Sequence, residues 1–235
     1  MNVLCTICAR GGSKGVKNKN IKNINGKPLI SYSINQALKS NIFNEIVVST
    51  DSRQISKISK KFKAESWFLR PKNLSNDKSE KIYAIRHALI TSEKYFNKKY
   101  DYIVDLDASS PLRSIEDIKK SFKKFINTNS SNLVTLCESR KNPYFNMIEI
   151  KKNVLKKVKK LKKKGVRRQD APKVYEMNAS IYIWSRKTLL SDMKIINNRT
   201  SYYIMPYNRS IDIDNIDDFN YVNHLMKRND KRIRK

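Results

Sequence analysis

Three of the five glycines in the chain lie between Gly11 and Gly15, directly after the apolar run 3–9. Glycine permits positive φ and lets a ligand approach the main chain closely. Successive backbone N–H groups in such a turn bind anions, and Arg10 and Lys14 add full positive charges. The next polar residues that could reach the same anion are Lys17, Lys19 and Asn20. The segment predicts a phosphate-binding loop, and we expect it to hold a triphosphate.

This loop matches neither of the common glycine-rich phosphate signatures. It lacks the G-x-x-x-x-G-K-[ST] pattern of a P-loop and the G-x-G-x-x-G pattern of a dinucleotide-binding turn. An ordinary surface turn would not need three glycines, so we interpret the segment as a different way of holding phosphate.

A pair of carboxylates near the end of the chain could hold a metal ion. In the segment 210–214, Asp212 and Asp214 alternate with isoleucines, so on a strand both would project from one face, about 6–7 Å apart. Such a pair suits Mg²⁺, which takes its remaining ligands from phosphate oxygens and water. The alternative is that Asp214 only caps the final helix, whose dipole Asp217 and Asp218 would complement.

A second aspartate alternation, Asp105-Leu-Asp107, ends an apolar strand. We expect Asp105 to be buried against a backbone partner and Asp107 to face the site. Aspartate pairs of this kind also hold nucleotide sugars through a metal in glycosyltransferases, which keeps that function as an alternative. The arginines that could add cations are Arg70, which precedes Pro71, and Arg168, which ends a lysine-rich loop.

The elements that must position these residues alternate along the first 140 residues. The expected strands cover 3–9, 46–50, 64–68, 102–107 and 132–137, and the expected helices cover 28–40, a segment capped by Asp51 or Ser52, 79–96 and 114–125. This alternation predicts an α/β fold with a mostly parallel sheet covered on both faces. Ligands of such sheets bind at the carboxyl ends of the strands, where the glycine loop and Asp107 would meet.

The pattern is interrupted between residues 142 and 178. The segments 144–150 and 154–158 resemble a β-hairpin, and the basic loop 159–168 follows. We interpret 142–178 as an arm inserted into a single domain that spans 1–235, serving as a lid or a dimer contact. The α/β pattern resumes with strands at 180–184 and 202–205 and a helix at 215–227.

The formal net charge of +29 would ordinarily suggest nucleic acid or an anionic membrane. The excess is almost all lysine, spread over the whole chain without interleaved aromatic residues, so we expect no specific nucleic-acid partner. A nucleic-acid-binding module built on 151–168 is kept only as an alternative. No stretch approaches the roughly 20 apolar residues of a membrane span.

The three cysteines indicate a reducing cytoplasm rather than a disulfide framework. Cys5 and Cys8 lie three apart on a strand and therefore point to opposite faces, so we expect them not to share a metal.

Several ordered motifs together resemble the acylneuraminate cytidylyltransferases, the CMP-sialic acid synthetase family. They are 9–15 with 19–21, 26–30, 47–51, 68–71, 110–113, 168–169, 178–182 and 210–214. The resemblance covers nearly the whole chain and implies a Rossmann-like three-layer nucleotidyltransferase fold with a small β-rich dimerisation arm. It also implies a homodimer, in which the arm reaches the neighbouring subunit's site.

The activity that the resemblance implies is transfer of CMP from CTP to a nine-carbon 2-keto sugar acid, with release of pyrophosphate. The residues implied to bind the nucleotide are Arg10, Gly11, Gly12, Ser13, Lys14, Asn20 and Arg70. Those implied to act in catalysis are Arg10, Lys19, Asp212 and Asp214, the last two as ligands of Mg²⁺ or Mn²⁺. Those implied to approach the sugar are Asp107, Arg168 and Asn178.

Three positions differ from the usual family pattern. Asp107-Ala-Ser replaces Gln-Pro-Thr, Glu176-Met177 replaces Arg-Pro, and Lys81 stands where a small serine is common near the base. The first two, together with the Cys5 to Cys8 segment, are similar to the branch associated with legionaminic acid. A nucleotidyltransferase that uses another sugar or another nucleotide donor is the nearest alternative.

Overall fold

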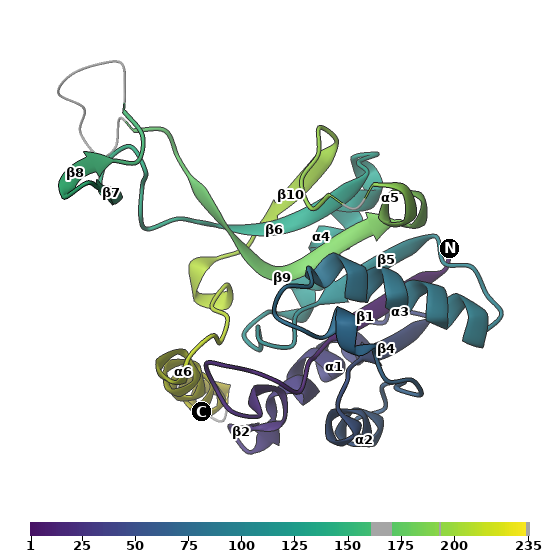
Figure 1. Cartoon of the computed structure of the whole chain (residues 1–235). Coiled ribbons are helices and arrows are strands. Elements are labelled where there is room, and N and C mark those ends of the chain that lie inside the picture. Colours follow the sequence, from purple (N-terminus) through teal and green to yellow (C-terminus); the bar gives the residue numbers. More distant parts are fainter. Residues whose placement is uncertain (161–170, 193, 234–235) are drawn as a thin grey trace.

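A six-stranded sheet forms the centre of the computed structural model, which describes residues 1–160, 171–192 and 194–233. Its strand order is β10-β6-β9-β5-β1-β4 (Figure 1). The strands are β1 (Val3–Cys8), β4 (Glu45–Ser49), β5 (Tyr102–Leu106), β6 (Asn132–Glu138), β9 (Tyr175–Ser185) and β10 (Thr200–Ile204). All neighbouring pairs are parallel except those of β9, which runs antiparallel to both β5 and β6. The predicted, mostly parallel α/β sheet is confirmed.

Helices cover both faces of this sheet. They are α1 (Leu29–Ser40), α2 (Arg53–Lys61), α3 (Lys81–Tyr95), α4 (Ile115–Asn127) and α5 (Arg186–Ser191), whereas α6 (Ile216–Ile233) packs in a separate cluster. One buried cluster joins one face of the strands to α1, α2 and α4, and a second joins the other face to α3 and α5. The result is a three-layer arrangement, visible in Figure 1.

The sequence explains how each element begins and which way it faces. Along β1, successive side chains alternate between the two clusters, so Cys5 and Cys8 face opposite sides as expected. The Ser52 side chain caps α2 by accepting from the Ile55 N–H, and Ser114 and Asp117 form a capping box at α4. These two caps mark the points where the loops after β4 and β5 end and α2 and α4 begin.

The last helix packs against the N-terminal loop and the start of α1 in a separate small core. Val16, Ile24 and Leu29 pack there against Ile213 and one face of α6. Two short strands, β2 (Asn23–Ile24) and β3 (Lys27–Pro28), form the antiparallel turn before α1. Short 3₁₀ turns cover Lys19–Ile21, Lys72–Leu74 and Tyr207–Arg209. The N-terminal loop and the C-terminal segment are thus packed together, although they are about 200 residues apart in sequence.

The expected strand at 64–68 is wrong. Only Glu65 pairs with the sheet, through a single parallel bridge to Val47, and the chain then leaves the edge of β4. Pro71 and the turn after it direct the chain over the carboxyl edge instead.

The arm begins as expected with a β-hairpin, although the strands are shorter than predicted. β7 (Ile148–Lys151) and β8 (Val154–Lys157) pair only with each other and stand apart from the central sheet (Figure 1). The loop that follows lies largely in 161–170, outside the described residues. Among the described residues, no helix is long and apolar enough to cross a membrane.

Candidate active site

A cleft of about 410 Å³ opens at the carboxyl edge of the sheet. Its walls come from the loop after β1, the segment 70–79, the start of α3, the loop after β5 and Asp214. The predicted site residues that line it are Arg10, Ser13, Lys14, Lys19, Asn20, Arg70, Asp107 and Asp214. The structure therefore brings together residues that the sequence placed far apart.

The glycines of the loop are needed for close approach rather than for unusual backbone angles. Among the described glycines only Gly26 has a positive φ, so the expected positive φ in the loop is wrong. A Cβ on Gly15 would lie 1.9 Å from the carbonyl oxygen of Asp214, and one on Gly11 would lie 3.2 Å from the Cβ of Ser52. Gly12 faces open space. The loop thus fits tightly against the C-terminal aspartate segment.

Part of the backbone N–H array is already used within the protein. The Gly11 N–H donates to the carboxylate of Asp51 at 2.8 Å, and the Ala9 N–H donates to the carbonyl of Ser49 at 3.0 Å. These contacts tie the loop after β1 to the end of β4. They hold Arg10 at the mouth of the cleft.

Asp77, an acidic residue that no sequence motif marks, forms ion pairs with the cations of the glycine loop. Asp77 pairs with Arg10 through one carboxylate oxygen and with Lys14 through the other, the latter at 2.6 Å. These hydrogen bonds from Lys14 and Arg10 lower the pKa of Asp77. A carboxylate bridging two cations mimics a phosphate, so a bound phosphate would compete with Asp77 for both of them.

Two further predicted phosphate ligands also have structural partners. The buried Asn20 amide donates to the carbonyl of Arg10 at 3.0 Å, and so supports the loop from behind. The Lys19 ammonium donates to the Ile213 carbonyl at 2.5 Å and lies 3.8 Å from the Asp214 carboxylate. Lys19 therefore connects the loop to the aspartate pair and is only 15% exposed.

Arg70 lines the cleft from the segment that follows β4. Its backbone N–H donates to Thr50 at the end of β4, and its Nε donates to the hydroxyl of Ser75 at 3.0 Å. The side chain is buried. Arg70 thus links the edge of the sheet to the segment that carries Asp77.

The aspartate pair is not on a strand, contrary to expectation. Residues 210–214 have no regular structure, and the segment is held by the Ile213 N–H, which donates to Ser109 at 3.0 Å, and by burial of the Ile213 side chain. Asp212 is half-buried and Asp214 is exposed. Asp214 does not cap α6 either, since the Asn215 side chain accepts from the Asp217 and Asp218 N–H groups.

The surroundings of Asp212 disfavour the charged form of its carboxyl group in the protein alone. Burial and the neighbouring Asp214 carboxylate raise its pKa to about 6. No group of three or more His, Cys, Asp or Glu side chains in the described chain could hold a metal by itself. Two carboxylates that repel each other beside a cationic loop fit Mg²⁺, a cation that takes few protein ligands and completes its shell with phosphate and water.

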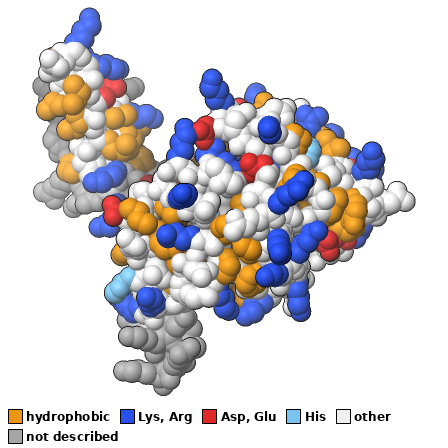
Figure 2. Space-filling view, turned by 60° about the horizontal axis from the view of Figure 1, so that its bottom comes forward, with side chains coloured by type: hydrophobic (Ala, Val, Ile, Leu, Met, Phe, Trp, Pro, Cys, Tyr) orange, Lys and Arg blue, Asp and Glu red, His pale blue; other side chains and the backbone are white. Residues whose placement is uncertain are grey.

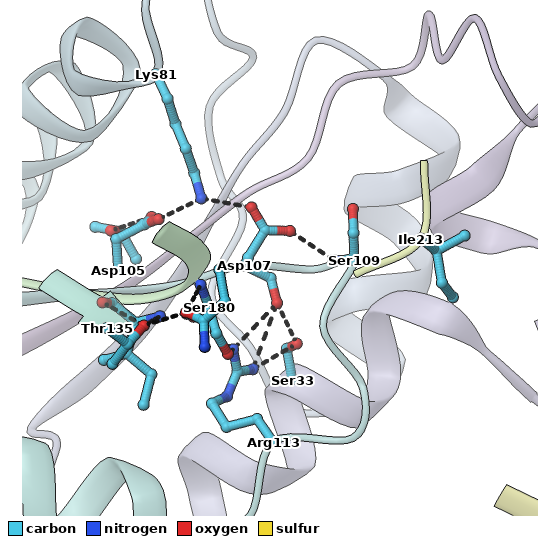
Figure 3. Close-up of polar contacts among 12 residues, drawn as sticks. Ser33, Lys81, Asp105, Asp107, Ser109, Arg113, Thr135, Ser180 and Ile213 are labelled. Carbon is cyan, nitrogen blue, oxygen red and sulfur yellow. Dashed lines mark hydrogen bonds and ion pairs between the residues drawn. The ribbon is translucent and has the colours of Figure 1, made fainter. Parts of the chain in front are cut away.

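The second aspartate pair is neutralised by a lysine rather than open to a metal. The Lys81 ammonium lies 2.7 Å from an Asp105 oxygen and 2.8 Å from an Asp107 oxygen (Figure 3). The other Asp105 oxygen accepts from the Thr6 hydroxyl at 2.8 Å, so its partners are side chains and not the expected backbone. Although burial opposes ionisation, Lys81 lowers the pKa of Asp107 to about 2.

A buried arginine supports this cluster from below. Arg113 donates to the carbonyls of Ser180 and Asp107 and to the side chains of Ser33 and Gln36 (Figure 3). It therefore fixes the loop after β5 against both α1 and β9. The side chain is only 2% exposed, so its role in the fold is structural.

Of the remaining two predicted sugar contacts, the structure describes only Asn178, which does not line the cleft. The Asn178 amide is buried, where it accepts from the Thr135 hydroxyl and donates to Ser210, and it stabilises the bulge of β9 around Ala179, whose φ is 52°. Arg168 lies outside the described residues.

Sequence reasoning therefore missed one residue of the cleft and undervalued another. Asp77 belongs to no recognisable motif, and only its contacts with Arg10 and Lys14 reveal it. Lys81 and Asp107 both depart from the family pattern, but no local pattern connects the two. Their separation by 26 residues conceals a direct ion pair.

Comparison with known proteins agrees with this geometry. Residues 4–232 match the family model described as Cytidylyltransferase. The chain belongs to the cytidylyltransferase family. The resemblance drawn from the sequence motifs is thereby confirmed.

Two relatives match this cytidylyltransferase over nearly its whole length. The "Post-translational flagellin modification protein B" of Campylobacter coli is 47% identical over 225 residues, which cover 96% of this chain and 95% of that protein. The "CMP-N,N'-diacetyllegionaminic acid synthase" of Campylobacter jejuni is 47% identical over 224 residues, 95% of this chain and 94% of that protein.

The fold of the cytidylyltransferase also matches a solved structure. A CMP:2-keto-3-deoxy-manno-octonic acid synthetase complexed with CTP superposes with a TM-score of 0.72 over 97% of this chain and 100% of that one. At 14% identity this likeness concerns the fold. The expected nucleotidyltransferase fold is confirmed.

The close approach of residues 15 and 214 leads to a first prediction. Gly15→Ala would place its Cβ against the Asp214 backbone, so the aspartate segment must shift, and we expect a loss of about 1–3 kcal/mol of stability. Thermal unfolding measures the loss. Gly12→Ala is the matched control, because its Cβ meets open space and its melting temperature should change by no more than about 1 °C. Equal melting temperatures for both variants would contradict the assigned contact.

The raised pKa of Asp212 leads to a second prediction. Since the folded pKa of about 6 exceeds the ordinary value of 3.8, the charged form destabilises the protein as the pH rises through 6. Asp212→Asn removes this cost, so without divalent cations its Tm at pH 8 should exceed that of the unchanged protein by about 2–4 °C. The difference should vanish below about pH 4, where both side chains are neutral. Scanning calorimetry at both pH values tests this, and a variant of lower Tm at pH 8 would contradict it.

Proposed function

We propose that this cytidylyltransferase activates a nine-carbon 2-keto sugar acid of the legionaminic or sialic acid type with CTP, giving the CMP-sugar and pyrophosphate. The observation that carries the proposal is that Asp214 lines the same cleft as Arg10 and Lys14 of the glycine loop, with its backbone packed against Gly15. The matched relative that is named for CMP-N,N'-diacetyllegionaminic acid synthesis supports legionaminic acid as the sugar.

The reaction is in-line attack by the anomeric hydroxyl of the sugar on the α-phosphorus of CTP. Negative charge grows on the phosphoryl oxygens and on the departing pyrophosphate, so the enzyme must position two anions and stabilise charge. Arg10 and Lys14 exchange Asp77 for the β- and γ-phosphates, and they stabilise pyrophosphate as it leaves. Lys19, held beside Asp214, keeps the glycine loop and the aspartates in register during the reaction.

Asp212 and Asp214 are the residues that would hold Mg²⁺, which when bound supplies Lewis-acid neutralisation of phosphoryl oxygens. Their mutual repulsion in the protein alone supports this assignment. Arg70 is buried, lines the same cleft and is assigned to the nucleoside.

The glycosyltransferase alternative receives no support from the cleft. That function requires a metal between Asp105 and Asp107, and the Lys81 ammonium lies between those two carboxylates. The free thiols of Cys5, Cys8 and Cys137 agree with the cytoplasm, the compartment that we propose for the enzyme.

We also propose that the enzyme acts as a homodimer through its arm. Ile148, Ile150 and Leu155 share one face of the hairpin, and 56, 71 and 68% of their surfaces, respectively, are exposed. Figure 2 shows hydrophobic side chains gathered on this protruding lobe. An isolated two-stranded hairpin is marginally stable in water, so this face requires a partner, and a second copy of the chain is the occupant that we propose.

The proposed reaction is tested by incubating the purified protein with Mg²⁺, a panel of nucleoside triphosphates and a panel of sugar acids while pyrophosphate is measured. We expect release only with CTP and a nonulosonic acid. Arg10→Ala should lower kcat/KM about 100-fold, because one charge-stabilising donor is lost. Asp212→Asn should lower kcat more, and Mg²⁺ with CTP should raise the Tm of the unchanged protein but not of this variant. Release of a nucleoside diphosphate, or no release with any sugar acid, would refute the proposal.

The proposed dimer is tested by sedimentation. The unchanged chain should sediment as a dimer, and the Ile150→Lys, Leu155→Lys double variant as a monomer, because two charges are placed on the apolar face of the hairpin. Glu149→Lys changes the opposite face of the same hairpin and should leave the dimer intact. A monomeric unchanged chain at micromolar concentration would rule out the arm as a dimer contact.

A further inference from the structure

Two of the residues that depart from the usual family pattern form one physical unit beside the cleft. Lys81 opens α3 and Asp107 follows β5, and the two are joined by an ion pair of 2.8 Å (Figure 3). Asp105 completes the unit and is fully buried, whereas the side chains of Lys81 and Asp107 are 28 and 20% exposed. Lys81 and Asp107 also line the cleft.

Lys81 is the cation that pairs with both carboxylates among the described ion pairs. Asp105 is fully buried, and its other side-chain contacts are with the Thr6 hydroxyl and the Cys8 thiol. Removing one partner of a buried charge pair is strongly destabilising, because the other charge remains buried and unpaired. Lys81 therefore supports the charge of the whole unit and, together with the Ser109 N–H and Lys19, favours the ionised form of Asp107.

Pairing with the lysine also restricts Asp107 to accepting hydrogen bonds. One of its oxygens accepts from Lys81 and the other from the Ser109 N–H at 2.7 Å. An ionised carboxylate has about four acceptor positions and no donor, so Asp107 can still accept from a ligand but cannot donate. An amide at this position would offer both kinds of contact, and it could turn.

Asp107 lies near the groups where the reacting atoms meet. Lys19 and Asp212 both belong to its electrostatic surroundings, since the charge of Lys19 favours ionisation of Asp107 and the charge of Asp107 disfavours ionisation of Asp212. Asp107 also lines the same cleft as Lys19 and Asp214, so a sugar acid bound beside them lies within reach of its carboxylate.

We propose that Lys81 is a specificity-determining positioning residue: by pairing with Asp107 it fixes an acceptor-only group in the cleft, which selects sugar acids that present an O–H or N–H donor there. The inference rests on the proposed function, because it requires a sugar acid as the second substrate. It assigns to Lys81 a role toward the sugar rather than toward the base of the nucleotide.

The test compares a nonulosonic acid with analogues in which one hydroxyl or acylamino group is replaced by hydrogen. For the unchanged enzyme, kcat/KM should fall at least 100-fold with the analogue that lacks the donor facing Asp107. In Lys81→Met this discrimination should fall at least tenfold, while the KM for CTP stays within twofold. In an Asp107→Asn background the lysine substitution should change the discrimination less than twofold, because Lys81 acts through Asp107.

Two further variants complete the test, one against a failure of folding and one as a matched control. Lys81→Met combined with Asp105→Asn neutralises the carboxylate that the single variant leaves buried, and it should reproduce the loss of discrimination in a folded protein. Lys98→Met is the matched control, since Lys98 also pairs with a carboxylate, Glu45 at 3.1 Å, and lies over a tyrosine ring, but beyond the opposite end of α3. It should leave the discrimination unchanged.

The results separate this inference from the proposed function. Unchanged discrimination in both Lys81 variants, or a rise in the KM for CTP with the sugar preference intact, would overturn the role given to Lys81 alone. An unchanged enzyme that accepts none of the sugar acids would overturn both.

Discussion

The carbonyl oxygen of Asp214 lies where a side chain on residue 15 would begin, and this contact decides how the cleft is assembled. It brings the first loop of the chain against one of its last segments, and Lys19 secures the same junction by donating to the Ile213 carbonyl. Because the loop carries cations and the segment carries carboxylates, a polyanion and a divalent ion can be held within one site. The sheet supplies the platform, but this junction creates the site.

Charge balance is the second constraint on the cleft. The cations gathered in the cleft repel one another unless opposite charges lie between them. The protein compensates with its own carboxylates, Asp77 across Arg10 and Lys14, and Asp105 with Asp107 across Lys81. Asp212 and Asp214 form a pair with excess negative charge, and burial together with Asp214 raises the pKa of Asp212 to about 6. The excess negative charge suits a cation, and the cations that Asp77 neutralises suit an anion.

Local sequence was sufficient for features whose cause is local. The apolar runs predicted the order of strands and helices except for the strand expected at 64–68, and the expected cap at Ser52 is present. The alternation in β1 predicted that Cys5 and Cys8 face opposite sides. The concentration of glycine at 11–15 marked a loop that lines the cleft, but the expected positive φ is wrong. Gly11 and Gly15 instead avoid collisions with distant segments, and collisions of that kind leave no trace in a local pattern.

The sequence by itself determined the α/β fold, the sheet edge that carries the site and the residue types gathered there, because these follow from periodicity, capping and chain order. Only the tertiary structure decided which charges pair. In the structure, Lys81 pairs with Asp105 and Asp107, and Asp77 pairs with Arg10 and Lys14. Asn178 is buried, and Asp212 and Asp214 lie in a segment without regular structure. The physical reason is that ion pairs and close contacts depend on distances in space between segments, and separation along the chain does not reveal those distances.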